Sequence, residues 1–220
     1  MLIPDDIRKC VAFIGTEVNG VNKAIGSVFF VGKVDKEGEL NAIYAVTARH
    51  NIDAIRNSNR TKVMVRLNDL SGGNTWIWSD AAGWFSNPRD PSIDVAIHQF
   101  NIPANYDHLV FPMELFLTEE IIKENEIGLG DEVVISGLFK YHFGDKRNIP
   151  IVRTGNIAGF HEEKIPTKNF GLMDAHLIEC RSISGLSGSP VFVNIGMIRR
   201  VNDLPKIMNG KPPLYLGLAE

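Results

Sequence analysis

The segment SGLSGSPVF, residues 184–192, has the composition of a loop that presents a nucleophilic serine. Gly185 lets the chain turn so that the backbone N–H groups of Gly185 and Ser187 can converge on one point as an oxyanion hole. Gly188 leaves the approach of a substrate carbonyl unobstructed, and Pro190 can begin the following strand. The alternative for this segment is a Gly/Ser-rich hairpin loop without chemistry.

A histidine stands at the end of an apolar strand in YAVTARHNI, residues 44–52. The pattern places His50 where the strand gives way to a short helical turn. Imidazole has a pKa near neutral pH, which suits a general base that is held firmly. The alternative is a surface histidine after a strand, and for His50 taken alone that alternative is preferred.

An aspartate immediately precedes an apolar strand in SIDVAIHQF, residues 92–100. In this position the carboxylate of Asp94 can lie at the edge of a β-barrel and orient an imidazole from behind. The alternative is an aspartate in the turn that enters the strand, which is a common role for this residue type. Asp94 alone therefore decides nothing.

The three segments taken together are far more specific than any one of them. Their order along the chain, His50 then Asp94 then Ser187, is that of the chymotrypsin-type triad. Further motifs in the same order are GSVFFVG (26–32), GDEVVISG (130–137) and LGLA (216–219). On these motifs the chain resembles trypsin-like serine peptidases over nearly its whole length, in particular the short-looped bacterial HtrA-like and glutamyl-endopeptidase-like groups.

The resemblance implies an all-β fold of two six-stranded antiparallel β-barrels, the trypsin-like double barrel, with the active site between them. It also implies a serine endopeptidase that works through an acyl-enzyme intermediate. Ser187 would be the nucleophile and His50 the general base and then acid, while Asp94 would hold the imidazole. The N–H groups of Gly185 and Ser187 would form the oxyanion hole.

The resemblance places Arg181, Ser182 and Ile183 beside the pocket for the residue before the scissile bond. Arg181 suggests acidic substrates, but a solvated or salt-bridged arginine is the preferred interpretation, because burying an unpaired charge is costly. Animal digestive members carry an aspartate where Leu186 stands, and this aspartate pairs with a freshly cut amino terminus. Because Leu186 cannot form such an ion pair, we expect no zymogen switch of this kind. The opposite pocket wall normally follows LGLA, so we expect the second barrel to be incomplete near Glu220, which leaves room for a further C-terminal domain or a regulatory partner.

Short runs rich in Val, Ile and Phe between Gly, Asn, Asp and Pro predict strands almost throughout. The predicted strands cover residues 10–15, 26–34, 42–48, 62–67, 75–78, 94–100, 131–137, 149–160, 172–180, 190–194 and 214–219. Only residues 117–127 are predicted to be helical, with Thr118 as the N-cap. The predicted domains are an N-terminal barrel at 1–115 with His50 and Asp94, a linker at 116–128, and a C-terminal barrel at 129–220 with Ser187.

The composition sets limits on the partners. The chain has 220 residues and a formal net charge of −3, so no basic excess suggests a nucleic-acid partner. No apolar run is long enough to span a bilayer, and the N-terminus lacks the features of a signal peptide, so we expect a cytoplasmic protein without a membrane partner. Cys10 and Cys180 are predicted to be unpaired, buried thiols.

Other classes of protein fit the sequence less well. An α/β-hydrolase needs a histidine after the nucleophile, but the last histidine is His176, and a subtilisin-type order needs a convincing aspartate before His50. No motif with metal-ligand spacing occurs, so no metal or cofactor is predicted. The alternative that stays open is a catalytically inactive trypsin-like fold that binds peptides or acts as a scaffold. Retention of all three triad residues favours a peptidase, whose partner would be a protein or peptide substrate.

Overall fold

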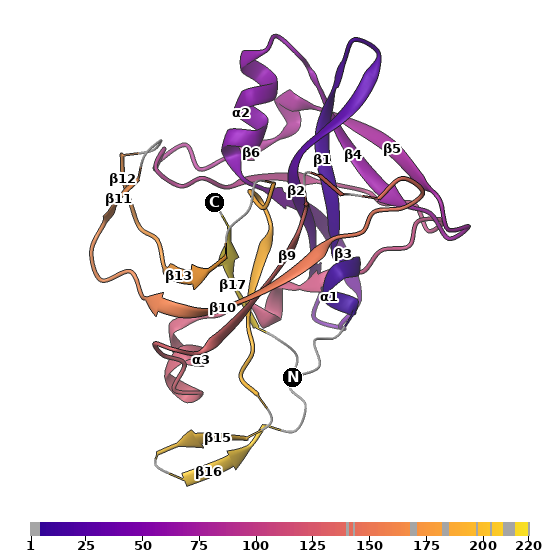
Figure 1. The fold of residues 1–220 in the computed structure, drawn as a ribbon. Helices are drawn as coiled ribbons and strands as arrows, with labels where there is room; N and C mark the ends of the chain where they lie inside the picture. Colours follow the sequence, from indigo (N-terminus) through magenta and orange to yellow (C-terminus); the bar gives the residue numbers. More distant parts are fainter. Residues whose placement is uncertain are drawn as a thin grey trace.

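The computed structural model describes residues 5–139, 141–142, 144–167, 171–181, 185–196, 198–202, 204–208 and 214–219. Within these residues, most strands belong to two sheets, one built mainly from each half of the chain. In Figure 1 the indigo and purple strands of the first half occupy mainly the top and right of the view, and most of the orange and yellow strands of the second half lie below or to the left of them. None of the described helices is long and apolar enough to cross a membrane.

The first sheet runs in the order β5-β4-β1-β2-β3-β7-β6, and β8 adds to β2 in parallel. Its strands are β1 (Val11–Val18), β2 (Val21–Val34), β3 (Leu40–Thr47), β4 (Lys62–Asn68), β5 (Asn74–Asp80), β6 (Phe85–Ser86), β7 (Ala96–Gln99) and β8 (Phe111–Pro112). Helix α1 (Asp6–Lys9) precedes β1, and helix α2 (Arg49–Asn57) follows β3. Two 3-10 turns lie at Ala81–Gly83 and Met113–Leu115. The turn between β1 and β2 is Asn19-Gly20, with φ of 54° and 76°, as two-residue hairpins prefer.

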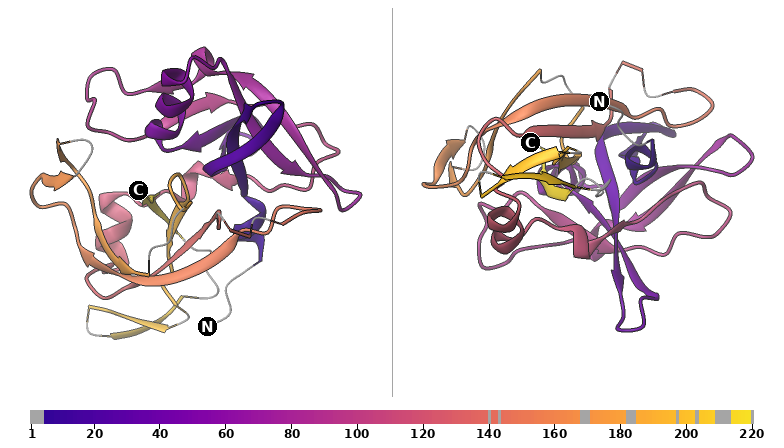
Figure 2. Two further views of the ribbon diagram at one scale, coloured as in Figure 1. Left: turned by 45° about the horizontal axis from the view of Figure 1, so that its top comes forward. Right: turned by 90° about the horizontal axis from the view of Figure 1, so that it is seen from below.

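The second sheet runs in the order β13-β10-β9-β14-β17 and is antiparallel. Helix α3 (Glu119–Glu124) leads into it. Its strands are β9 (Glu132–Gly137), β10 (Ile151–Gly159), β13 (Leu177–Cys180), β14 (Pro190–Val193) and β17 (Leu214–Leu218). Two separate hairpins are formed by β11 (Ile165–Thr167) with β12 (Gly171–Met173), and by β15 (Ile198–Val201) with β16 (Leu204–Ile207). Figure 1 and the left view of Figure 2 show the β15–β16 hairpin at the lower edge, on the side away from α2.

Each half of the chain has its own apolar core, and a third cluster joins the two. The rings of this third cluster form what we call the aromatic seam: Phe29, Phe111, Phe116, Phe192 and Tyr215. Ring centroids are 5.4 Å apart for Phe29 and Tyr215 and 5.1 Å apart for Phe111 and Phe192, which are favourable separations for aromatic pairs. Burial raises the pKa of the Tyr215 phenol, so it stays neutral in the seam. The seam packs the two sheets against each other.

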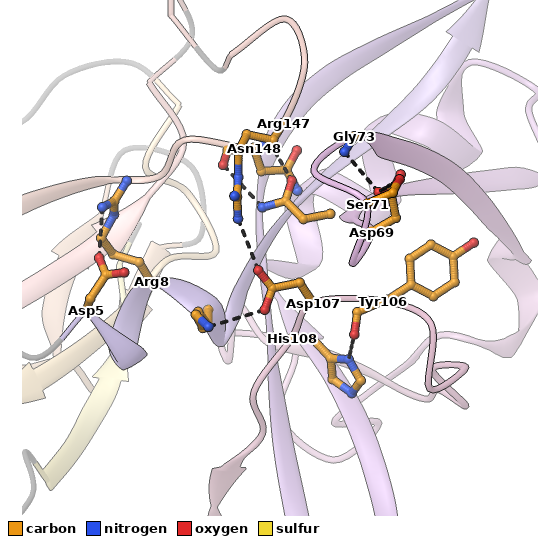
Figure 3. Close-up of polar contacts among 12 residues, drawn as sticks. Asp5, Arg8, Asp69, Ser71, Gly73, Tyr106, Asp107, His108, Arg147 and Asn148 are labelled. Atoms are coloured by element: carbon orange, nitrogen blue, oxygen red, sulfur yellow. Dashed lines mark hydrogen bonds and ion pairs between the residues drawn. The ribbon is translucent and has the colours of Figure 1, made fainter.

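Ion pairs lie at one side of the contact between the two halves of the chain. Asp107 pairs with Lys9 at 3.3 Å and with Arg147 at 3.1 Å, so it joins α1 to the segment that precedes β10. Figure 3 shows Arg147 bonded to Asp107, and Arg8 bonded to Asp5 nearby. These side chains are partly exposed, and ion pairs in such positions contribute little free energy. The apolar cluster that contains the aromatic seam therefore contributes more to the cohesion between the halves than these ion pairs.

Most predicted strands are confirmed to within a few residues, but the strand predicted at 172–180 is wrong. It is divided into β12 and β13, because β12 pairs with β11 whereas β13 pairs with β10. The predicted helix is confirmed as α3, with Thr118 accepting a hydrogen bond from Ile121 N. Cys10 and Cys180 are free thiols as predicted, although Cys180 is only half-buried; burial raises the pKa of the Cys10 thiol to about 12.

The prediction of a single helix is wrong, because the chain also forms α1 and α2. The usual start signal is missing at α2: Ala48 stands at its N-cap and has no side chain that can accept a hydrogen bond. The helix instead buries Ile52 and Ile55 and takes its cap from a distant residue, as shown below. A start signal supplied from elsewhere in the fold cannot be read from the local sequence.

The closure of the sheets into two six-stranded barrels is not confirmed. In the described part of the chain, the first sheet has eight strands and ends at β5 and β6. The second has five and ends at β13 and β17. Among the described strands, the two edge strands of each sheet do not pair with each other, so neither sheet closes into a barrel. The mainly β, antiparallel architecture is nevertheless as predicted.

The importance of the aromatic seam can be tested by truncation. Phe192 is fully buried, so Phe192→Ala should lower the free energy of unfolding by about 3–5 kcal/mol, because it leaves a cavity between the sheets. Phe85→Ala is the matched control, since Phe85 is 67% exposed, and it should change stability by about 0.5 kcal/mol or less. Urea unfolding measures both. Equal effects of the two substitutions would contradict the role of the seam.

Candidate active site

Asp94 caps the helix that carries His50, although the two residues are far apart in sequence. Oδ1 of Asp94 accepts a hydrogen bond from the backbone N of His50 at 2.9 Å, and the carbonyl of Asp94 accepts one from the backbone N of Arg49 at 3.2 Å. The first N–H groups of a helix have no partner within the helix, and Ala48 supplies none. The backbone of α2 is therefore held at its N-terminus by the segment before β7.

The other carboxylate oxygen of Asp94 contacts the imidazole itself. Oδ2 lies 2.6 Å from Nδ1 of His50, and Asp94 is 3% exposed whereas the His50 side chain is 34% exposed. A carboxylate only accepts hydrogen bonds, so Nδ1 carries the proton and Nε2 of the neutral ring keeps its lone pair. The arrangement fixes the tautomer and the orientation of a partly exposed imidazole.

The loop around Ser187 needs its glycines for steric reasons. Gly185 has φ of +108° and Gly188 has φ of +86°, in the region that L-residues rarely adopt. A Cβ added at Gly188 would lie 2.2 Å from the carbonyl oxygen of Ser27. The turn is closed by a hydrogen bond from Ser189 N to the carbonyl of Leu186 at 2.8 Å. The loop therefore packs directly on β2 of the first sheet.

Ser187 is brought next to the helix of His50 through its backbone carbonyl. This oxygen accepts hydrogen bonds from Ser27 N at 2.9 Å and from Nδ2 of Asn51 at 3.3 Å. Among the described contacts, the Ser187 hydroxyl makes no hydrogen bond with the His50 ring. Such bonds are often long in free enzymes and shorten when substrate binds. The structure thus brings together His50 and Asp94 directly, and Ser187 with α2 through Asn51.

The N–H groups of Gly185 and Ser187 were predicted to bind an oxyanion. In the described part of the protein, neither group donates to a protein acceptor. Their convergence on one point stays a prediction.

The predicted pocket residues are only partly described. Arg181 is exposed, in line with the preferred interpretation of a solvated arginine, whereas Ser182 and Ile183 lie outside the described residues. Sequence reasoning missed a cavity of about 440 Å³ beside Asp94, between the edge strands β13 and β17. Apolar side chains form most of its lining, including Ile178, Cys180, Leu186, Val191, Leu216 and Leu218. Since these residues come from both edge strands, from β14 and from the loop around Ser187, only the folded sheet shows that they share a cavity.

His176, which directly precedes β13, also lines this cavity. Its ring lies 4.9 Å from that of His161, measured between centroids. Burial lowers the pKa of His176, and the neighbouring His161 lowers it further. At neutral pH the ring is therefore uncharged, and the cavity stays predominantly apolar.

No family model matches the chain, and no curated protein matches it. Among solved structures, the chain is similar to Deg5, with 17% identity and a TM-score of 0.53 over 85% of this chain and 75% of that one. It is also similar to the protease domain of MamO from Magnetospirillum magneticum, with 16% identity and a TM-score of 0.55 over 97% of this chain and 93% of that one. At these identities the likeness shows the fold alone. The chain shares the fold of these two structures, which is the trypsin-like fold that the sequence motifs predicted.

The capping role of Asp94 can be tested through stability. Asp94→Ala removes the acceptor of the His50 N–H and of Nδ1, so the free energy of unfolding should fall by about 2 kcal/mol, which combines a lost N-cap with a lost buried hydrogen bond. Asp80→Ala is the matched control, because Asp80 caps only the 3-10 turn at Ala81–Gly83 and is exposed. Urea unfolding of both variants decides. A smaller loss for Asp94→Ala than for Asp80→Ala would contradict the proposed cap.

Proposed function

We propose that the chain is a serine endopeptidase that hydrolyses peptide bonds through an acyl-enzyme intermediate. Ser187 is the nucleophile, His50 the general base and acid, and Asp94 the residue that holds the imidazole. The observation that carries the proposal is the double contact of the Asp94 carboxylate with the backbone N and Nδ1 of His50. This contact prepares Nε2 as a base in a fold shared with protease domains.

In the first half of the reaction, the Ser187 hydroxyl oxygen attacks the carbonyl carbon of the scissile peptide bond. Nε2 of His50 takes the hydroxyl proton, and Asp94 stabilises the imidazolium that forms. When the tetrahedral intermediate collapses, the C–N bond breaks and His50 returns the proton to the leaving amine. The product of this half is an acyl ester on Ser187.

In the second half, water replaces the amine. His50 takes a proton from the water as the water oxygen attacks the ester carbonyl, and then gives this proton to the Ser187 oxygen as the ester bond breaks. The new C-terminal carboxylate leaves and the site returns to its initial state. In both halves the negative oxygen of the tetrahedral intermediate is assigned to the N–H groups of Gly185 and Ser187, and each such donor contributes about 3 kcal/mol in enzymes of this type.

The preference for a substrate side chain is inferred from the cavity beside Asp94 and not from Arg181. Because Arg181 is exposed, it gives no support for a preference for acidic residues. The apolar lining of the cavity beside Asp94 instead favours a protein or peptide substrate with an apolar side chain near the scissile bond. The described sheets are open. The double barrel, with the site between its halves, is therefore part of the proposal.

A second candidate is a non-catalytic trypsin-like fold that binds peptides. One observation is compatible with it: the cavity beside Asp94 has a mostly apolar lining that could hold a peptide side chain without any chemical step. Such a protein would bind extended peptides without cleaving them. The experiment below separates the two candidates.

Covalent labelling with a fluorophosphonate probe tests the proposed nucleophile and base. We expect the wild-type chain to take up one probe molecule on Ser187. Ser187→Ala should abolish labelling, and His50→Ala should lower its rate by about 10³-fold or more, because the hydroxyl loses its base. Intact-mass spectrometry with peptide mapping measures the site and the rate.

The control is Ser71→Ala, which alters an exposed serine in the β4–β5 loop and should label at the wild-type rate. Circular dichroism confirms that each variant is folded. A folded wild-type chain that takes no label and cleaves no peptide would contradict the peptidase proposal and favour the peptide-binding candidate.

A further inference from the structure

Asn51 is a buried polar residue on the face of α2 that packs into the protein. It follows His50 directly and is 4% exposed, in company with the apolar Ile52 and Ile55. Burial of an amide is unfavourable unless its hydrogen-bonding groups find partners, and asparagine is a poor helix former. An apolar side chain would satisfy the helix better at this position. The burial of this amide is therefore explained by its hydrogen bonds and not by helix propensity.

The amide group of Asn51 connects two parts of the candidate site. Nδ2 donates to Oγ1 of Thr47 at 3.2 Å and to the carbonyl oxygen of Ser187 at 3.3 Å. A carbonyl oxygen only accepts hydrogen bonds, so the group of Asn51 that meets it is the NH₂. Thr47 precedes the helix of His50, whereas Ser187 belongs to the loop of the second sheet. One side chain thus spans the junction between the base and the nucleophile.

The acceptors of Asn51 are themselves fixed by a buried network. Oγ1 of Thr47 donates to the carbonyl of Ser27 at 2.7 Å, and Oγ of Ser27 accepts from Oγ of Ser189 at 3.0 Å and from Leu138 N at 2.7 Å. Thr47, Ser27 and Ser189 have no exposed surface. Polar groups in such surroundings have few alternative partners, so the network specifies one geometry.

Gly26 leaves the space that these contacts require. A Cβ added at Gly26 would lie 2.5 Å from Nδ2 of Asn51 and 2.9 Å from the Ser187 carbonyl oxygen. Both distances are too short for ordinary contact. The close approach of Asn51 and Ser187 thus depends on a residue without a side chain on β2.

We infer that Asn51 is a positioning residue that sets the place of Ser187 relative to His50. It acts on the backbone carbonyl of the nucleophile and does not touch the reacting atoms. This inference rests on the proposed peptidase function, since it assigns a role within the same site. The hydrogen bonds from Asn51 Nδ2 and from Ser27 N to the carbonyl of Ser187 hold the nucleophile beside the first sheet.

The test uses the whole chain and the variant Asn51→Leu, which keeps a similar volume and removes the amide. We expect the rate of fluorophosphonate labelling by the folded protein to fall roughly 10- to 100-fold, since a displacement of about 1 Å has effects of that size. The pH dependence of the rate should keep its midpoint, because the contact of His50 with Asp94 is left intact. Gly26→Ala should produce a similar loss by a different route, and the double variant should be little worse than either single variant.

The matched control is Asn125→Leu. Asn125 is also 4% exposed, and its Nδ2 also donates to a backbone carbonyl, that of Ile121 at 2.8 Å, but it lies at the end of α3. This substitution should lower stability to a similar extent and leave the labelling rate unchanged. A purely structural role for Asn51 predicts the same result for both variants.

Hydrogen exchange of the backbone amides at 185–189 gives a readout that does not require activity. It should accelerate in Asn51→Leu and remain unchanged in Asn125→Leu. If the wild-type chain takes no label, the peptidase proposal fails, and the exchange rates alone decide whether Asn51 holds the serine loop. Unchanged exchange, or a wild-type labelling rate in folded Asn51→Leu, overturns the inference.

Discussion

The geometry of the candidate site depends on one buried carboxylate. Asp94 is 3% exposed and uses its two oxygens for different tasks: one completes the N-terminus of α2, and the other holds the ring of His50. A carboxylate at a helix N-terminus is also favoured by the helix dipole. The same carboxylate that stabilises the helix therefore also orients the imidazole of His50, and a change at this position alters the helix and the geometry of the site together.

This arrangement is useful only if the second half of the chain meets the first in a fixed position. The aromatic seam supplies the cohesion, since large rings bury much apolar surface and pack with defined geometry. The buried hydrogen bonds of Ser27, Thr47 and Asn51 supply the register at the site itself. The apolar contacts and the buried hydrogen bonds thus occupy different parts of the contact between the two halves. The loop around Ser187 lies next to both.

The sequence predicts the residues with distinctive chemistry better than the contacts between them. His50, Asp94 and Ser187 stand out because their order along the chain matches a known triad, and Gly185 and Gly188 stand out because few residues can make that turn. Most strands follow from short runs rich in Val, Ile and Phe between turn residues. The start of α2 could not be predicted, because its cap comes from the distant Asp94. The role of Asn51 could not be predicted either, because a single buried asparagine has no sequence pattern. The cavity between β13 and β17 is likewise a product of pairing between distant strands.

In the arrangement described above, the Asp94 carboxylate holds a proton on Nδ1 of His50. Proton NMR of the imidazole can detect this proton, because a short hydrogen bond to a carboxylate shifts the bonded proton strongly downfield. We expect one such resonance in the wild-type protein, which disappears in His50→Gln and moves upfield in Asp94→Asn. A folded protein without this resonance at any pH, or one whose resonance survives in His50→Gln, would contradict the claim.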